Sequence, residues 1–182
     1  MDDIIWQIGI NIHNIKDLIN YSSISKQHNI IIKKNRWLHI ILKLSKNSQL
    51  LLMIKNYNFG NIDLSYSNMT DESVSKLINA HTLYLSGTNV TDESVFKLTN
   101  AHTLYLGGTN VTDESVSKLI NAHTLILSCT NVTDKSVSKL INAHTLDLSC
   151  TKVTDSRQSG KLLSFIILRV AQNNKSNRCE CI

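Results

Sequence analysis

The sequence predicts an α/β solenoid in which short parallel strands form one side and short helices form the other. Two observations carry this prediction. A unit of 21 residues repeats four times without a break from Thr70 to Val153. Within each unit, the spacing of apolar residues changes from a helical period to a strand period. Because one such unit is too small to bury its own apolar face, neighbouring units must stack and share a core.

The first half of each copy predicts a helix. The copies begin at Thr70, Thr91, Thr112 and Thr133 and read close to TDESVSKLINAHTLYLSGTNV. Val74, Leu77 and Ile78 lie at i, i+3 and i+4, which is the spacing of one apolar helical face. The leading threonine stands where an N-cap belongs, and the Asp-Glu pair after it suits the first turn. We expect the helix to end at Asn79.

The second half of each copy predicts a strand. Leu83 and Leu85 alternate with Thr82, Tyr84 and Ser86, which is the period of an extended chain with one buried face. The leucines therefore point into the core, and the residues between them point away from it.

This half also resembles the leucine-rich repeat, whose core reads L-x-x-L-x-L-x-x-N/C-x-L. Its five marked positions are occupied by Ala80, Leu83, Leu85, Thr88 and Val90. The V-T-D that follows is similar to the cysteine-containing subtype common in F-box proteins. The resemblance implies a leucine-rich-repeat solenoid with a parallel sheet on its concave face and short helices on its convex face.

Degenerate copies extend the repeats in both directions. One period earlier, Ile62-Asp63-Leu64 matches the strand and Met69 matches Val90; one period later, a one-residue insertion places a last strand at Leu168-Arg169-Val170. We expect five strands and a sixth at the end. The predicted regions are a helical region at 1–45, repeats at 46–170 (first copy 49–69, regular copies 70–153, last copy 154–170) and a polar tail at 171–182.

The outward strand positions are the candidate binding residues. The central position varies most between copies, and two adjacent tyrosines flanked by aspartates are typical of an interaction surface. The alternative is unselected variation at exposed positions. The predicted target-binding residues are Asp63, Thr82, Tyr84, Thr103, Tyr105, Ile126 and Asp147.

Three further columns recur once per copy. His81, His102, His123 and His144 form the first. A histidine row can in principle bind metal or sense pH, but no carboxylate or thiol recurs beside it, so we favour a structural or surface role. We expect Thr88 and its equivalents to bond the loop backbone. Cys129 and Cys150 replace Gly87 and Gly108, and small size suffices to explain that column.

Residues 1–45 predict a small helical cap on periodicity alone. Their order also resembles an F-box: an acidic-aliphatic helix, an aliphatic helix carrying Asp-Leu, and a closing tryptophan. The matching residues are Asp3, Ile4, Ile5, Ile8, Asp17, Leu18, Ile24 and Trp37. The usual Leu-Pro opening is missing, and Ser25 stands where a cysteine is common.

Together with its composition, the whole chain resembles F-box and leucine-rich-repeat proteins of giant DNA viruses of amoebae (mimivirus-like). The resemblance implies a substrate-recognition adaptor of a host Skp–cullin–F-box ubiquitin ligase in the host cytoplasm. Contact with the Skp adaptor would come from Ile4, Ile5, Ile8, Leu18 and Ile24. The alternatives are that these residues seal the solenoid, that the repeats bind a partner without a ligase role, or that the chain is a decaying paralogue.

Other function classes are disfavoured. No nucleophile–base–acid set, phosphate loop or metal triad stands outside the copied positions, so we predict neither an enzyme nor a cofactor. The net charge of +5 sits in the flanks, because residues 70–153 carry six basic against eight acidic residues; we predict no nucleic-acid partner. The four cysteines lack zinc-site spacing, which favours a reducing compartment.

The sequence predicts no membrane association. Its first residues lack a secretory signal, and no apolar run approaches the length of a membrane span. One feature points the other way: Cys179-Glu180-Cys181-Ile182 has the outline of a prenylation box, although glutamate and cysteine match its aliphatic positions poorly.

Overall fold

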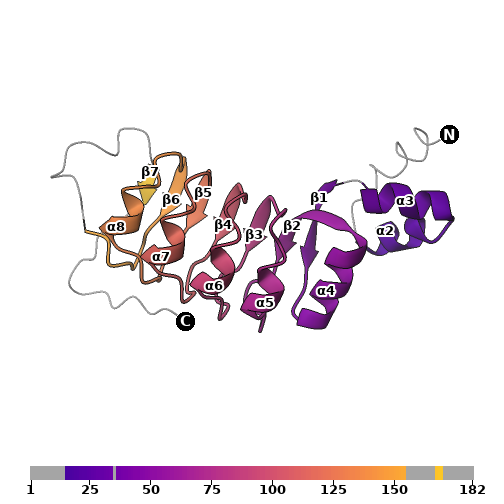
Figure 1. The fold of residues 1–182 in the computed structure, drawn as a ribbon, viewed down its shortest axis with the longest axis horizontal. Helices are drawn as coiled ribbons and strands as arrows, with labels where there is room; N and C mark the ends of the chain where they lie inside the picture. Colours follow the sequence, from indigo (N-terminus) through magenta and orange to yellow (C-terminus); the bar gives the residue numbers. More distant parts are fainter. Residues whose placement is uncertain (1–14, 35, 155–166, 170–182) are drawn as a thin grey trace.

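The computed structural model describes residues 15–34, 36–154 and 167–169. Two helices, α2 (Ile15–Ser22) and α3 (Lys26–Lys34), precede a parallel sheet in which every strand lies beside its neighbours in sequence (Figure 1). Its strands are β1 (Arg36–Lys43), β2 (Asn58–Asp63), β3 (Thr82–Tyr84), β4 (Thr103–Tyr105), β5 (Thr124–Ile126), β6 (Thr145–Asp147) and β7 (Ile167–Arg169). The connecting helices are α4 (Asn47–Asn56), α5 (Asp71–Val74), α6 (Asp92–Val95), α7 (Asp113–Val116) and α8 (Asp134–Val137).

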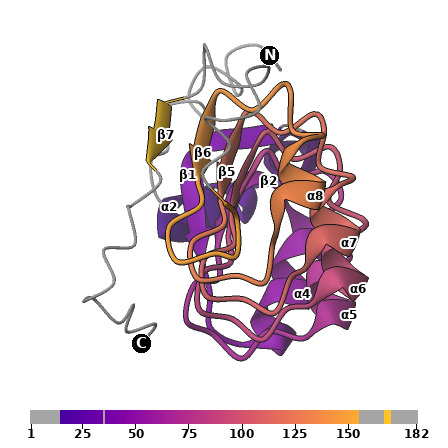
Figure 2. The ribbon, with the colours of Figure 1, turned by 90° about the vertical axis from the view of Figure 1, so that its left-hand side faces the viewer.

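The strands and helices form two layers, as the repeat pattern predicts. The strands line one side of the solenoid and α4 to α8 line the other, while α2 and α3 lie beyond β1 at the N-terminal end (Figure 1). Viewed along the stack, each repeat is one turn of chain that runs from strand to helix and back (Figure 2). The predicted α/β solenoid of stacked repeats is confirmed.

Strand pairing places equivalent residues of successive copies side by side. Thr82 pairs with Thr103, Thr103 with Thr124, and Thr124 with Thr145. Each side chain of the sheet therefore belongs to a row that runs across the strands, about 4.8 Å apart from one member to the next. A residue type at one position of the repeat unit is therefore repeated in a row across the surface of the sheet.

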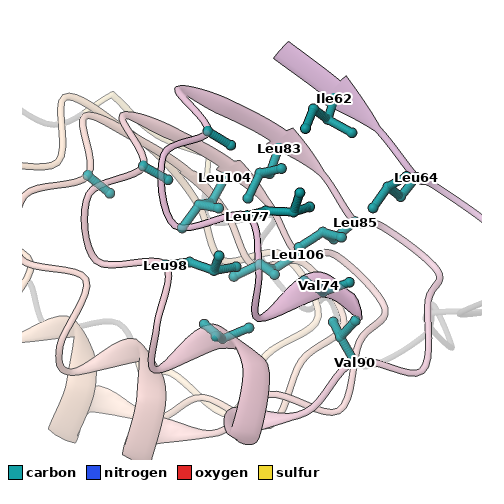
Figure 3. Packing of buried hydrophobic residues seen from close by; sticks show 14 of the residues in the cluster. Ile62, Leu64, Val74, Leu77, Leu83, Leu85, Val90, Leu98, Leu104 and Leu106 are labelled. Atoms are coloured by element: carbon teal, nitrogen blue, oxygen red, sulfur yellow. The ribbon is translucent and has the colours of Figure 1, made fainter. Parts of the chain in front are cut away.

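The core fills the space between the layers. Leu83 and Leu85 are fully buried, and so are Val74 from the helix and Val90 from the following loop. Figure 3 shows these side chains together with Leu98, Leu104 and Leu106 of the next copy, and all of them belong to one continuous core cluster. The predicted inward leucines are confirmed.

The helices are much shorter than predicted. Helix α5 ends at Val74, and the chain continues in turns whose backbone N–H groups donate to the carbonyl three residues earlier: Leu77 to Val74, and Ala80 to Leu77. Such turns have three residues each, so every third side chain faces the core, and Val74, Leu77 and Ala80 are buried. The prediction that the helix reaches Asn79 is therefore wrong, and Ile78 is 46% exposed instead of on the buried face.

The threonine predictions hold at both ends of the unit. Thr70 caps α5, its hydroxyl accepting from the Ser73 backbone N–H. The Thr88 hydroxyl donates to the Leu85 carbonyl at 2.6 Å, and Thr109 and Thr130 repeat this bond in the next copies. Each of these buried hydroxyls closes the turn that follows its strand.

Small size alone does not explain the column of glycines and cysteines, although a Cβ at Gly87 would lie 2.5 Å from the Tyr66 ring. All of these residues have a positive φ, between 57° and 67°, and so has Tyr66, the equivalent residue of the first copy. Since tyrosine is large and 81% exposed, the shared requirement is a left-handed backbone at this turn. Glycine meets that requirement without steric strain.

A ladder of aspartates links successive repeats on the helix side. The Asp92 carboxylate accepts from the Thr112 backbone N–H at 3.0 Å and from the Thr112 hydroxyl at 2.6 Å. Asp71 holds Thr91 in the same way, and Asp113 holds Thr133. These aspartates bind the N-cap of the next helix rather than only their own first turn.

The helical region is shorter than predicted, because Arg36–Lys43 forms a strand. Strand β1 pairs in parallel with β2, with a register shift between Trp37 and Ile41. The Trp37 side chain is fully buried, and its indole N–H donates to the Ile32 carbonyl at 2.9 Å, which ties α3 to the sheet. The extent of 1–45 as a helical region is therefore corrected; residues 1–14 lie outside the described part of the chain.

The ends of the repeat region differ in how they depart from the pattern. Helix α4 and strand β2 occupy the predicted first copy, where Met69 is buried as expected. Strand β7 spans Ile167–Arg169, one residue before the expected position, and Arg169 lies in register with Asp147. The polar tail lies outside the described residues, and so do the prenylation outline and its Cys179.

Candidate functional site

One row of residues crosses the sheet on the face that points away from the helices, which we call the concave face. It contains Lys43, Asp63, Tyr84, Tyr105, Ile126 and Asp147, brought into register by strands β1 to β6. Five of these residues were predicted as target-binding residues, and all five are half-buried. The sheet thus assembles the central row as the alternation predicts.

The two tyrosines form the centre of this row. The Tyr84 and Tyr105 rings stack with their centroids 4.5 Å apart and an angle of 20° between their planes. Burial, and then the fields of Tyr105 and Asp63, raise the pKa of the Tyr84 phenol above its usual value. The Tyr84 phenol is therefore neutral, and the stacked pair is continuous with Ile126, which makes an apolar patch with polar tips.

Aspartates stand at both ends of the patch. Asp63 forms an ion pair with Lys43 at 3.3 Å and accepts from the Ser65 backbone N–H. Burial alone would raise the Asp63 pKa, but the hydrogen bonds from Ser65 and Lys43 outweigh it and hold the pKa below its usual value. Asp147 accepts from the backbone N–H and the hydroxyl of Ser149. Each carboxylate is oriented by the turn after its own strand.

A second row lies beside the first and is mostly threonine. Thr82 and Thr103, both predicted as target-binding residues, are half-buried and pair with each other across β3 and β4. Their hydroxyls accompany the tyrosines along the concave face. The predicted set therefore forms two adjacent rows on one surface.

The part of this face that β1 supplies does not follow from the pattern of the regular copies. Lys43 neutralises Asp63, and Leu38 and Ile41 expose apolar side chains on β1. Leu38 also lies directly over Gly60, where a Cβ would collide with it. The sequence spacing was consistent with an additional strand: Lys43 precedes Asp63 by 20 residues, one fewer than the regular period.

The residues predicted to contact a Skp adaptor are only partly placed. Leu18 is fully buried in the core cluster, so its side chain is not presented to a partner. Ile24, between α2 and α3, is 63% exposed. Ile4, Ile5 and Ile8 lie outside the described residues.

The described part of the chain also has features that bear on ligand binding, metal binding and membrane insertion. A surface hollow of about 570 Å³ on the helix side is lined by charged groups of both signs, including Asp113, Lys118 and Lys139, and does not overlap the concave face. Among the described residues, no group of three or more histidine, cysteine or acidic side chains converges as a metal site. No helix among them is long and apolar enough to cross a membrane.

Comparison with known proteins supports the fold. No family model matches the sequence, and no curated protein matches it. Among solved structures, internalin C2 from Listeria monocytogenes matches with a TM-score of 0.53 at 16% identity, over 89% of this chain and 77% of that one. The chain folds as a leucine-rich-repeat solenoid.

Two further leucine-rich-repeat structures match more loosely. An internalin from the same bacterium matches at a TM-score of 0.48 and 17% identity over 73% of this chain, and a Leptospira interrogans protein at 0.49 and 18% over 78%. The chain spans 46% and 38% of the lengths of these two proteins.

Proposed function

We propose that this chain is a scaffold for protein–protein interaction and that its concave face binds a segment of a target protein. The observation that carries the proposal is the stacked Tyr84–Tyr105 pair, continued by Ile126 and flanked by Asp63 and Asp147. Tyrosine is enriched among the residues that dominate binding energy at interfaces, because it buries a large area with few rotatable bonds.

The dimensions of the face fit a short segment of a partner. Five strands about 4.8 Å apart span about 20 Å, enough for one helix or an extended peptide. Lys43 pairs with Asp63 at one end of the row, and Arg169 lies in register with Asp147 at the other. The face therefore suits a segment with apolar side chains over the tyrosines and polar groups toward both ends.

We further propose that the N-terminal helices dock on the Skp adaptor of a host cullin ubiquitin ligase. Two observations support this assignment: a helical pair precedes the repeats, and Ile19, Ile24 and Ile30 expose aliphatic side chains on it. Because Leu18 is buried, the contact would involve Ile24 together with Ile4, Ile5 and Ile8. The alternatives are a binding module without a ligase role and a paralogue without a selected function.

The target-binding proposal is tested by affinity capture followed by binding measurements with the purified target. We expect the Y84A/Y105A variant to bind at least about tenfold more weakly than the wild type, since loss of two anchors at an interface typically exceeds 1.4 kcal/mol. Ile120→Ala, an exposed change away from the concave face, is the control and should bind normally. Equal affinity of both variants for the target would contradict the proposal.

The adaptor proposal is tested separately with purified Skp adaptor and cullin. The intact chain should bind the adaptor, and Ile24→Asp should abolish that binding. Ile141→Asp introduces the same charge at a similarly exposed isoleucine, 70% exposed, on the repeats, and should leave it intact. A folded chain that does not bind the adaptor refutes the ligase role and leaves target binding by the repeats standing.

A further inference from the structure

Four histidines form an unbroken stack along one edge of the sheet. His81, His102, His123 and His144 each precede a strand, and consecutive ring centroids lie 4.8, 4.7 and 4.8 Å apart. The angles between neighbouring ring planes are only 15°, 13° and 9°. The rings are therefore nearly parallel, and their spacing is that of the strands themselves.

The backbone holds the rings at this spacing. The His102 backbone N–H donates to the His81 carbonyl at 2.9 Å, and the same bond joins His123 to His102 and His144 to His123. The backbone therefore fixes the spacing of the four histidine Cα atoms, and a ring leaves the stack only by rotation of its own side chain or by separation of neighbouring repeats. Charge on the rings consequently acts on the contacts that hold the repeats together.

The surroundings of the stack do not compensate positive charge. Within the described residues, no carboxylate forms an ion pair with any of the four rings. The Arg36 guanidinium, which donates to the Asn79 carbonyl, adds a positive charge at the His81 end. The Nδ1 atom of His81 lies 3.3 Å from the Thr82 hydroxyl, and Nδ1 of His102 lies 3.3 Å from the Thr103 hydroxyl. A hydroxyl can donate to or accept from the ring, so it carries no compensating charge.

We propose that this histidine stack is a proton-sensitive element that weakens the association of neighbouring repeats in mildly acidic solution. Neutral imidazoles stack favourably, whereas imidazolium rings at the same separation repel. A central ring such as His102 has a like neighbour on each side. The element acts on the stability of the repeats and does not depend on a partner at the concave face.

The pKa directions agree with this geometry. Burial, and then the fields of His102 and Arg36, lower the pKa of His81. Desolvation, and then the fields of His102 and His144, lower the pKa of His123. The folded chain therefore binds fewer protons than the unfolded chain in acid, so that stability is retained above the usual histidine pKa and decreases as the pH falls below it.

The stack is better suited to protons than to a metal ion. Ring planes that face each other direct their nitrogen lone pairs side by side rather than toward a common point, as a tetrahedral site requires. This agrees with the lack of a convergent metal-binding group among the described residues.

Chemical denaturation of the full chain at several pH values tests the proposal. Between about pH 7.5 and pH 5, the unfolding equilibrium constant of the wild type should rise severalfold more than that of H102Q/H123Q, because the variant lacks two of the four rings that repel one another when protonated. Equal pH dependence of the two proteins would overturn the proposal.

Histidine NMR titration of the wild type and single variants gives an independent test if the double variant does not fold. His102→Gln removes one charge beside His81, so the His81 midpoint should rise. His28→Gln, which removes an imidazole from α3 outside the stack, should leave the His81 midpoint unchanged. Four rings that titrate independently, with the His81 midpoint unmoved by His102→Gln, would refute the proposal.

Discussion

Gly108 shows how a single backbone angle constrains the repeat. Its φ is +67°, and a Cβ there would meet nothing closer than the Gly87 backbone nitrogen at 3.9 Å. Space is therefore available, and the left-handed backbone is the only obstacle to a side chain. Cys129 occupies the same turn with a φ of 57°, so the fold tolerates the strain where another residue stands.

Substitutions at two adjacent glycines separate strain from space. Gly108→Ala should lower the free energy of unfolding by about 1 kcal/mol, because alanine disfavours a positive φ. Gly107 does not share that angle, and the equivalent residues are Ser86, Ser128 and Ser149. A Cβ at Gly107 would lie 2.7 Å from the Ser128 hydroxyl, which can rotate away, so Gly107→Ser should be within about 0.5 kcal/mol of the wild type. Urea denaturation measures both, and equal effects would contradict the role of φ.

Side-chain alternation predicted which strand residues lie on the concave face, but the sequence pattern did not predict which apolar residues of the helical half are buried. Tyr84, Tyr105 and Ile126 follow from the period of two, which strands obey closely. Leu77 and Ile78 are adjacent and equally apolar, yet only Leu77 is buried. Which of them enters the core depends on turns with a period of three, and the sequence spacing fits a helical period equally well.

At the scale of the element, the aspartate ladder is a side-chain link between successive repeats. The Asp92 carboxylate is bonded by Thr112 and by the Ser115 hydroxyl. Burial alone would raise the pKa of Asp92, but the hydrogen bonds from Ser115 and Thr112 outweigh it and lower the pKa. The same balance lowers the pKa of Asp71 and Asp113. The charged carboxylates therefore stabilise the stack.

Removing one aspartate of the ladder should lower the free energy of unfolding and make that free energy less sensitive to acidic pH. Asp92→Ala leaves the Thr112 backbone N–H without its acceptor, and should lower the free energy of unfolding by about 1–3 kcal/mol at neutral pH. Glu93→Ala, at the exposed neighbouring residue, should change it by about 0.5 kcal/mol or less.

The difference between wild type and Asp92→Ala should also vanish in acid. A carboxylate whose pKa is lowered on folding contributes stability above its usual pKa of 3.8 and loses it as the pH falls below that value. Thermal unfolding between about pH 5 and pH 2 measures this convergence. A difference that persists unchanged at the lowest pH would show that the rung acts without its charge.

Strand β1 was not predicted, because a mostly apolar stretch is typical of a buried strand and of a buried helix alike. Residues 30–44 form one such stretch, interrupted by Lys33, Lys34 and Arg36, and the structure divides it between α3 and β1. The register shift between Trp37 and Ile41 also breaks the period of two that would have distinguished the strand. The regular copies lacked this ambiguity, since four repetitions of the same pattern define the boundaries of each unit.

For the whole molecule, stability is distributed along one dimension. Each strand pairs only with its neighbours in sequence, and each aspartate rung joins only adjacent repeats. A destabilising substitution at one end should therefore have little effect on distant repeats. The apolar core at each end of the solenoid must also be capped. At the N-terminal end, Trp37 connects α3 to the sheet through its buried ring and its bond to Ile32.

Trp37→Ala should destabilise the molecule unevenly. Truncation of a fully buried tryptophan typically costs about 3–5 kcal/mol, and the loss should be concentrated in β1, β2 and β3. Hydrogen exchange at individual amides should show protection falling there and persisting in β5 and β6. A uniform loss of protection across all strands would instead indicate a single cooperative unit.

Because near-identical copies pair in exact register, the solenoid can be lengthened or shortened by one whole repeat. Copies 70–90 and 112–132 differ at only two positions, so excision of residues 91–111 would set Tyr84 beside Ile126 and give Asp71 the hydroxyl of Thr112. Every bond between neighbours would find an equivalent partner. Recombination between the repeats of such a gene can therefore lengthen or shorten the concave face by one strand, about 4.8 Å at a time, with new neighbours only among the side chains of the central row.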